Sequence, residues 1–166
     1  SSDGTGEGSS IEAEVEAPGT RPAPTPVQTE ALAALAKTRA DGYTAGLVVM
    51  ATGLGKTWLA AFDSENFRRV LFVAHREEIL DQACNTFCRV RPNDSMGKYD
   101  GSEKSPNAAV VFASIQTLGR QAHLNQFAAD AFDYIVVDEF HHASAATYRR
   151  LLAHFRPKFL LGLTAT

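Results

Sequence analysis

A lysine and a threonine follow two glycines in ATGLGKT, residues 51–57, directly after the apolar run AGLVVM. Glycine adopts backbone angles that other residues avoid, so Gly53 and Gly55 let consecutive backbone N–H groups face one point. Such groups, with the start of a following helix, form a nest for an anion. Lys56 would add a positive charge for the β- and γ-phosphates of a nucleotide, and Thr57 a hydroxyl for Mg²⁺. The sequence therefore predicts a phosphate-binding loop.

This loop departs from the strict phosphate-loop pattern at one position. The strict pattern has a glycine where this chain has Met50, whereas a variant that begins with alanine fits from Ala51 onward. The alternative is a tight strand-to-helix turn that carries a surface lysine. The residues expected to contact the nucleotide in this loop are Thr52, Gly53, Leu54, Gly55, Lys56 and Thr57.

Two adjacent carboxylates, Asp138 and Glu139, follow a second apolar run, YIVV. Side by side at a strand end they would repel each other, which favours a cation between them and the phosphates. Asp138 is expected to hold Mg²⁺ directly or through water, and Glu139 to orient or deprotonate an attacking water. The alternative is a pair of helix N-cap acids before SAATYRRL. His141 and His142 do not complete an H-E-x-x-H pattern, so zinc is not expected.

Strands and helices are predicted to alternate along the chain. Continuous apolar runs at AGLVVM, RVLFVA and FDYIVV are typical of buried strands, AGLVVM being expected to be buried on both faces of a sheet. Two further strands are predicted at AAVVFA and KFLLGL. Helical spacing favours helices at residues 27–42, 56–67, 76–90, 115–129 and 144–155, and a short strand is expected near 96–99. This alternation predicts an α/β fold with a doubly wound, mostly parallel sheet and helices on both faces.

In such a sheet, ligands bind at the carboxyl ends of the strands. Five polar segments follow the five main strands: ATGLGKT, HRE, SIQT, DEFHH and TAT. We therefore expect them to meet at one edge of one sheet.

Charge and composition divide the chain into two parts. Residues 1–20 hold five acidic and no basic residues and few large apolar ones, which predicts an acidic, disordered tail or linker over residues 1–21. The remainder holds fourteen acidic and sixteen basic residues, and residues 22–166 are expected to form one ATP-binding domain. The sequence has no apolar run of membrane-spanning length and no secretion signal, so a cytoplasmic setting is expected.

The segments ATGLGKT, VAHREEIL, FASIQTL, DEFHH and GLTAT occur in this order. Together they resemble the first RecA-like motor domain of superfamily-2 helicases and translocases of the DExH branch, and most of all the restriction-enzyme helicase-subunit type. The resemblance covers roughly residues 22–166. The set is specific, although each motif alone is weak.

This resemblance implies ATP and Mg²⁺ as cofactors. Gln28 would read the adenine edge, although the family more often has an aromatic residue where this chain has Val27. The matches to the phosphate, magnesium and water-activating positions are Lys56, Thr57, Asp138 and Glu139. His141 would couple the nucleotide site to Thr164 and Thr166 of the TAT segment.

The resemblance also implies a nucleic-acid track, with DNA favoured over RNA. The residues matching its backbone-contacting motifs are Arg76, Ser114, Gln116 and Thr117. Hydroxyls, amides and helix N-termini at strand ends suit phosphate contacts, which position a strand without reading its bases. The alternative is that Ser114 is only a helix N-cap and Arg76 a solvated charge.

Relatives continue after the TAT motif with a second RecA-like domain, which supplies an arginine finger worth about 10³–10⁵ in rate. We therefore expect the chain by itself to bind ATP weakly and to hydrolyse it slowly or not at all. Two alternatives to a helicase motor stay open: a non-motor phosphate-loop ATPase and an inactive nucleotide-binding fragment.

Overall fold

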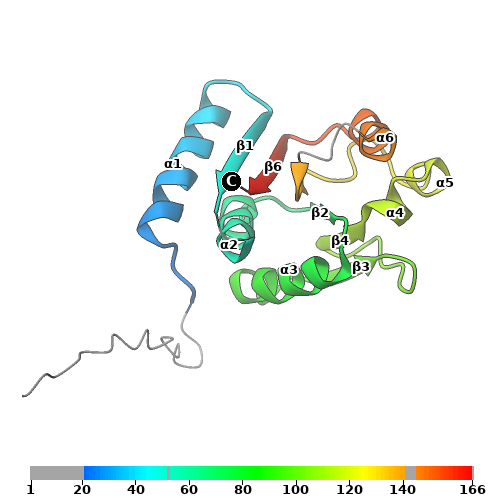
Figure 1. The fold of residues 1–166 in the computed structure, drawn as a ribbon, viewed down its shortest axis with the longest axis horizontal. Coiled ribbons are helices and arrows are strands. Elements are labelled where there is room, and N and C mark those ends of the chain that lie inside the picture. The colour runs from blue at the N-terminus through cyan, green and yellow to red at the C-terminus, as the bar shows by residue number, and fades with distance from the viewer. Residues whose placement is uncertain (1–20, 52, 141–144, 166) are drawn as a thin grey trace, which may run out of the picture.

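Six helices and six strands make up the fold in the computed structural model, which describes residues 21–51, 53–140 and 145–165 (Figure 1). The helices are α1 Pro26–Ala40, α2 Gly53–Ser64, α3 Glu77–Val90, α4 Ile115–Leu118, α5 Gln121–Leu124 and α6 Ala146–His154. The strands are β1 Ala45–Met50, β2 Val70–Ala74, β3 Met96–Tyr99, β4 Val110–Ser114, β5 Tyr134–Val137 and β6 Phe159–Ala165. No helix in these ranges is long and apolar enough to cross a membrane.

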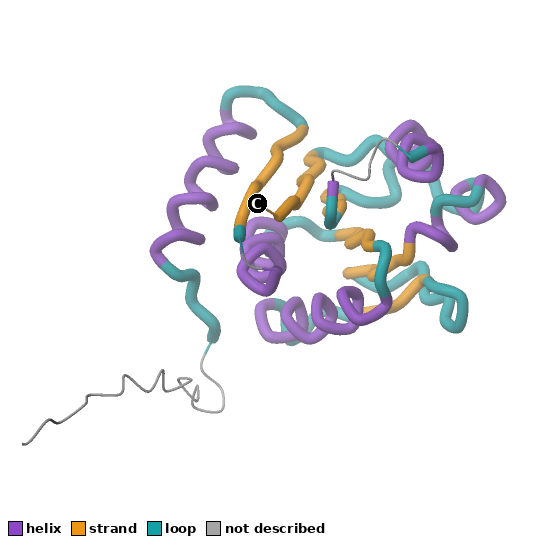
Figure 2. The backbone as a smooth tube through the Cα atoms, in the orientation of Figure 1, coloured by secondary structure: helices purple, strands orange, loops and turns teal. Residues whose placement is uncertain are grey.

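The strands, orange in Figure 2, form one six-stranded sheet in the order β1-β6-β5-β2-β4-β3. Every neighbouring pair is parallel. Because all strands run the same way, their carboxyl ends lie at one edge. The predicted doubly wound α/β fold is therefore confirmed, including the short strand at Met96–Tyr99.

Helices cover both faces of the sheet and produce two cores. On one face α1, α2 and α3 pack against alternate strand residues such as Phe72 and Phe112. On the other face α4, α5 and α6 pack against the residues between them, such as Val73 and Val137. Figure 1 shows α3 and α6 on opposite sides of the sheet. Strands β2, β4 and β5 are buried along their whole length, as their continuous apolar sequences predict.

The prediction that AGLVVM is buried on both faces is wrong. Strand β1 is at the edge of the described sheet and pairs there with β6 alone. Its burial alternates, and Leu47 and Val49 are 56% and 53% exposed. Val48 and Met50 contact the α1–α3 core, whereas Leu47 and Val49 point to the opposite face, away from that core.

The single helix expected over residues 115–129 is also wrong, because two short helices occupy that segment. Helix α4 ends at Leu118 and is capped by Gly119, whose N–H donates to the Ile115 carbonyl. Arg120 then has extended backbone angles, φ −78° and ψ 136°, and α5 begins after it. The break brings α4 and α5 against α6, where Arg150 donates to the Gly119 carbonyl at 3.1 Å.

Candidate nucleotide-binding site

The first turn of α2, which follows β1, and the end of β5 meet at the carboxyl edge of the sheet, although β6 separates the two strands. The residues from Gly53 to Thr57, predicted as part of a loop, are helical. Lys56 Nζ lies 3.5 Å from Asp138 Oδ1. The two residues are 5% and 6% exposed. The structure thus brings together the two charges that the sequence placed 82 positions apart.

Asp138 is buried without full compensation for its charge. Its Oδ1 atom has no hydrogen-bond partner with acceptable geometry, and its ion pair with Lys56 is longer than a hydrogen-bonded pair. Loss of solvation is the largest influence on this carboxyl and raises its pKa. The charge of Lys56 and a hydrogen bond from the Glu139 backbone N–H oppose that change, whereas the negative charge of Glu139 adds to it. A buried carboxylate oxygen of this kind has capacity to bind a further cation.

The donor set at this position fits magnesium. Asp138 offers the buried carboxylate oxygen, and Thr57 offers a hydroxyl one turn into α2. That hydroxyl makes only a long bond, 3.3 Å, to the Gly53 carbonyl. Hard oxygen ligands of these two types are the ones Mg²⁺ takes beside nucleotide phosphates. The residues present therefore fit the ion that the motif implies.

Glu139 has an uncommon backbone conformation. Its φ is +54°, and it is the one non-glycine residue with a positive φ in the described part of the chain. Left-handed backbone costs a non-glycine residue about 1–2 kcal/mol, and such residues cluster at functional sites. The strain falls on the residue that the sequence assigns to water activation.

Gln28 is buried, and both the oxygen and the nitrogen of its side-chain amide already make hydrogen bonds. Its Oε1 accepts from the Thr25 backbone N–H at 2.9 Å and closes a capping box at the start of α1. Its Nε2 donates to the Gly55 carbonyl at 3.3 Å. Gln28 thus ties α1 to the glycine loop. It retains one N–H and one lone pair for a ligand.

A cavity of about 490 Å³ lies beside Gln28. Its walls are mostly apolar, and Val27, Val49 and Met50 contribute to them. Val27 is 64% exposed, and its place ahead of Gln28 is where the family more often has an aromatic residue. A flat, mostly apolar base suits such a cavity. The residues lining it are Thr25, Val27, Gln28, Val49, Met50, Ala51 and Gly55.

The four residues expected to contact nucleic acid lie at two neighbouring strand ends. Arg76 is exposed at the start of α3, after β2. Gln116 is exposed after β4, and its amide donates to the His75 carbonyl at 2.8 Å. Ser114 is buried, and its hydroxyl accepts from the Thr117 backbone N–H at 3.3 Å. Ser114 therefore caps α4, Thr117 is half-buried, and Arg76 and Gln116 are exposed. Contact of these four residues with nucleic acid stays a prediction.

Of the predicted coupling residues, Thr164 is described. It is half-buried in β6 and lies opposite Val49 of β1. Thr52, His141 and Thr166 lie outside the described residues.

Two features of the site were missed by the sequence reasoning. Gly162 of β6 lies under the ring of Phe140, because a Cβ there would be 2.8 Å from Phe140 Cγ. The glycine in GLTAT was an available signal, since glycine inside a strand often marks close approach. The second feature is Tyr148 of α6, whose buried hydroxyl has no partner. No sequence signal distinguishes it from an ordinary core tyrosine.

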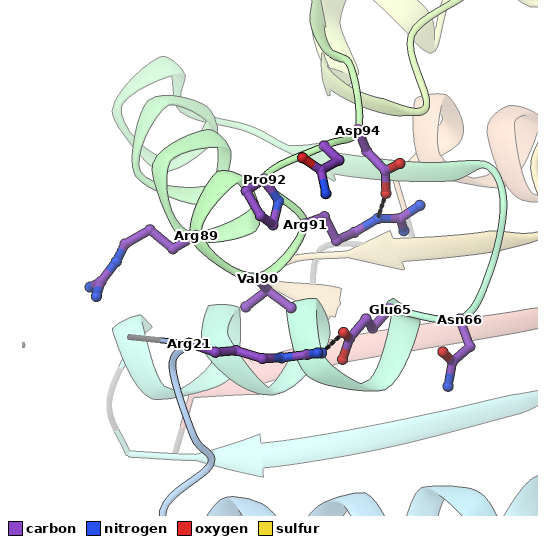
Figure 3. A pocket seen from close by; sticks show the side chains of 9 residues that line it. Arg21, Glu65, Asn66, Arg89, Val90, Arg91, Pro92 and Asp94 are labelled. Atoms are coloured by element: carbon purple, nitrogen blue, oxygen red, sulfur yellow. Dashed lines mark hydrogen bonds and ion pairs between the residues drawn. The ribbon is translucent and has the colours of Figure 1, made fainter. Parts of the chain in front are cut away.

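A larger cavity, about 530 Å³, lies between the ends of α2 and α3, away from the phosphate loop. Figure 3 shows its two ion pairs, Arg21 with Glu65 and Arg91 with Asp94. Arg91 also donates to the Ser64 carbonyl at 3.2 Å. Because four of its charged groups form these pairs and Arg89 lies over the Trp58 ring, this cavity offers less to a ligand than the strand ends do.

Comparison with known proteins identifies the family of this chain. The family model described as "Type III restriction enzyme, res subunit" matches residues 21–166. The chain is 35% identical over 140 residues to the type I restriction enzyme EcoAI endonuclease subunit of Escherichia coli, covering 76% of the chain and 17% of that protein. It is 34% identical over 137 residues to a putative DNA 3'-5' helicase Rad25 of Halobacterium salinarum, covering 77% of the chain and 22% of that protein.

A solved structure shares the fold. The SWI2/SNF2 ATPase core of Sulfolobus solfataricus, in complex with double-stranded DNA, superimposes with a TM-score of 0.70 at 17% identity. The match covers 88% of this chain and 32% of that one. The chain thus spans about a fifth of the two curated relatives and a third of this structure. Because the family model matches residues 21–166, the chain belongs to the family of the Type III restriction enzyme res subunit.

Proposed function

We propose that residues 22–166 form the ATP-binding motor domain of an ATP-dependent helicase or translocase, with residues 1–21 as a tail or linker. The observation that carries the proposal is the buried contact between Lys56 and Asp138, with its unbonded carboxylate oxygen. Two opposite charges held apart at 3.5 Å suit a site in which phosphate approaches the lysine and metal approaches the carboxylate.

The nucleotide would occupy one continuous path. Its base would enter the cavity beside Gln28, and its phosphates would lie against Lys56 and the start of α2. Mg²⁺ would be held by the Thr57 hydroxyl and Asp138, where it supplies charge neutralisation for phosphoryl transfer. Glu139 would orient the attacking water and accept its proton.

Nucleic acid would run over the exposed ends of β2 and β4. Arg76 and Gln116 offer donors there for backbone phosphates, and the contact between Gln116 and His75 ties the two loops together. DNA is proposed ahead of RNA because two relatives are a restriction endonuclease subunit and a putative DNA helicase, and the compared structure holds double-stranded DNA.

Efficient turnover would require a second RecA-like domain that contributes an arginine finger. The relatives are several times longer than this chain, which supports such a partner domain. Lys56, Asp138 and Glu139 are all present, so no missing catalytic residue supports the alternative of an inactive fragment. The non-motor ATPase alternative predicts no binding to nucleic acid.

Substitution of Lys56 tests the nucleotide site. Lys56→Ala should weaken binding of a fluorescent ATP analogue at least about tenfold, because a charged contact to phosphate is lost. Lys37→Ala is the matched control, since Lys37 pairs with Asp41 on the exposed surface of α1. Unaltered binding by Lys56→Ala would show that the phosphate-loop assignment is wrong.

Nucleic-acid binding separates the motor from a non-motor ATPase. The chain should bind unrelated single-stranded oligonucleotides with an affinity that falls as salt rises. Phosphate release by the chain alone should stay slow with or without single-stranded DNA. Strong stimulation by DNA would contradict the need for a second domain.

A further inference from the structure

The two helical layers of the molecule differ in their charge. Helices α1, α2 and α3 hold five acidic and four basic residues, whereas α4, α5 and α6 hold no acidic residue. Residues 104–129 and 140–166 likewise contain no aspartate or glutamate. Three arginines are exposed on α6 and between α4 and α5, namely Arg120, Arg149 and Arg150.

These three residues, the arginine cluster, lie on adjoining helices. Arg150 Nε donates to the Gly119 carbonyl at 3.1 Å, so its guanidinium reaches the residue next to Arg120. Helix α6 packs against both α4 and α5, and Figure 1 shows the three helices together. Leu151 is buried in the core, and Arg149, two positions before it, lies on nearly the opposite side of α6. The cluster therefore faces outward from this layer.

No acidic residue forms an ion pair with the arginine cluster within the described ranges. The ion pairs found there involve other basic residues, as when Arg39 pairs with Asp63. Asp133 directly precedes β5, at the amino edge of the sheet, and pairs there with Lys158 at 3.7 Å. Neighbouring charges of one sign repel one another, and a bound polyanion would relieve that repulsion.

The arginine cluster is continuous with the nucleic-acid track proposed at the strand ends. Helix α4 begins directly after β4, and Gln116 is exposed in its first turn. Gly119, which Arg150 contacts, comes three residues later, about one turn or roughly 5 Å along the helix. Successive phosphates of one strand of a duplex are about 3.4 Å apart along its axis. A strand that crosses Gln116 therefore reaches the cluster within a few nucleotides.

We infer that the arginine cluster binds backbone phosphates of the nucleic acid and extends the track from the ends of β2 and β4 onto α6. A guanidinium presents a planar fork of donors that matches the oxygens of a phosphate. Such contacts position a strand without reading its bases. The inference rests on the proposed function, because it adds a second contact region for the same nucleic acid. An acidic protein segment would also match the charge, but it would not account for the continuity with Gln116.

The salt dependence of binding tests the arginine cluster. The variant that combines Arg149→Ala with Arg150→Ala should bind a fluorescent single-stranded oligonucleotide of unrelated sequence more weakly, as measured by anisotropy. The slope of log affinity against log salt should fall in magnitude by about 0.7 for each lost phosphate contact, and so by about 1.4. At about 0.1 M salt this corresponds to an affinity about tenfold to thirtyfold lower.

The matched control removes two positive charges elsewhere. Lys37 and Arg68 are exposed, on α1 and just before β2, so Lys37→Ala with Arg68→Ala should keep the wild-type slope. If binding is intact and the Arg149 and Arg150 variant has the same slope as this control, the inference is overturned. The cluster would then be solvated or would serve another partner, such as an acidic protein segment.

Two further variants separate charge from folding, because Arg150→Ala also removes the bond to Gly119. Arg149 makes no side-chain hydrogen bond in the described part of the chain, so Arg149→Ala alone should fold normally and lower the slope by about 0.7. Arg149→Lys with Arg150→Lys should restore most of the slope, because both charges remain. A lysine pair that binds as weakly as the alanine pair would show that the loss came from folding, and would overturn the inference.

The two proposals fail in different ways. If the wild-type chain binds no nucleic acid, the proposed track is wrong and the arginine cluster has nothing to extend. If Arg76→Ala weakens binding while the Arg149 and Arg150 variant binds like the wild type, the proposed function stands and the role of the cluster is wrong.

Discussion

Two ion pairs lie at opposite edges of one sheet, and the hydrogen-bonding atoms of one pair are more fully satisfied than those of the other. Asp63 of the first pair is buried and its partner Arg39 is half-buried, whereas both members of the second pair are buried. At the amino edge, Arg39 binds both oxygens of Asp63 at 2.6 and 2.8 Å, and Tyr134 donates to the same carboxylate at 2.5 Å. At the carboxyl edge, Lys56 and Asp138 are 3.5 Å apart, and one carboxylate oxygen has no hydrogen bond.

The surroundings also compensate the charges of the Arg39–Asp63 pair more fully than those of the Lys56–Asp138 pair. The Arg39 guanidinium lies over the rings of Phe67 and Phe159, at 5.5 and 4.7 Å from their centroids. The hydrogen bonds to Asp63 raise the pKa of Arg39, so its charge is well compensated. For Asp138, lost solvation is the larger influence and raises its pKa. The first pair connects α1, α2 and β5 for stability, and the second leaves capacity for a ligand.

Removal of Asp63 should have the largest effect on folding. Asp63→Ala leaves the buried Tyr134 hydroxyl and the half-buried Arg39 without their shared acceptor. Breaking a fully buried pair costs about 3–5 kcal/mol, and because the Arg39 side chain is 25% exposed we expect the lower end, about 3 kcal/mol. The free energy of unfolding in urea should fall by that amount. Asp41→Ala, which removes the exposed partner of Lys37, is the control and should cost less than about 1 kcal/mol. If Asp63→Ala and Asp41→Ala lose equal free energy of unfolding, the Arg39–Asp63 pair is not the stabilising pair that this comparison requires.

A methyl group at Gly162 tests whether the carboxyl edge is tightly packed despite its unsatisfied atoms. Gly162→Ala would place a Cβ 2.8 Å from the Phe140 ring and 3.1 Å from Leu47. Overpacking of this kind costs about 1–3 kcal/mol, measurable by thermal or urea unfolding. The double variant Gly162→Ala with Phe140→Ala should recover part of the loss. No recovery would mean that Phe140 is not the residue in the way.

Neutralisation of Asp138 should have the smallest effect on folding and should depend on pH. The folded pKa of Asp138 is raised, so the native state binds more protons than the unfolded state just above the ordinary carboxyl pKa. Ionisation therefore lowers the free energy of unfolding as pH rises through that window. At pH 7 the free energy of unfolding of Asp138→Asn should equal that of the wild type or exceed it by up to about 1 kcal/mol.

Unfolding of both proteins between pH 4 and pH 7 checks this sign. The advantage of Asp138→Asn should grow as pH rises and should shrink toward the acid end. A variant that is clearly less stable than the wild type at pH 7 would show that Asp138, like Asp63, is a stabilising residue.

The sequence predicted the fold, and the meeting of Lys56 with Asp138 at the strand ends, because both follow from local patterns. Continuous apolar runs locate strands, and the glycines before Lys56 locate a predicted phosphate-binding segment, which in the structure is the first turn of α2. The exposed face of β1 could not be predicted in this way, because a run such as AGLVVM does not show which strand is at an edge. The break at Gly119 depends on packing against α6, which residues 115–129 alone do not show.

The finer parts of the site were also beyond a reading of local sequence. Whether the hydroxyl of Tyr148 has a partner depends on residues from α4, α6 and β5 together. The two bonds of Gln28 likewise depend on how α1 meets the glycine loop. Such contacts are set by tertiary packing, whereas residue type and spacing set only what each group can do.

The central claim is that Lys56 and Asp138 share one magnesium-bound nucleotide. Calorimetric titration of the wild-type chain and Asp138→Asn with ATP, with and without Mg²⁺, tests it most directly. Mg²⁺ should strengthen ATP binding at least about tenfold in the wild type, because Asp138 supplies a ligand oxygen, and this gain should be lost in Asp138→Asn. An equal gain from Mg²⁺ in both proteins would contradict the claim.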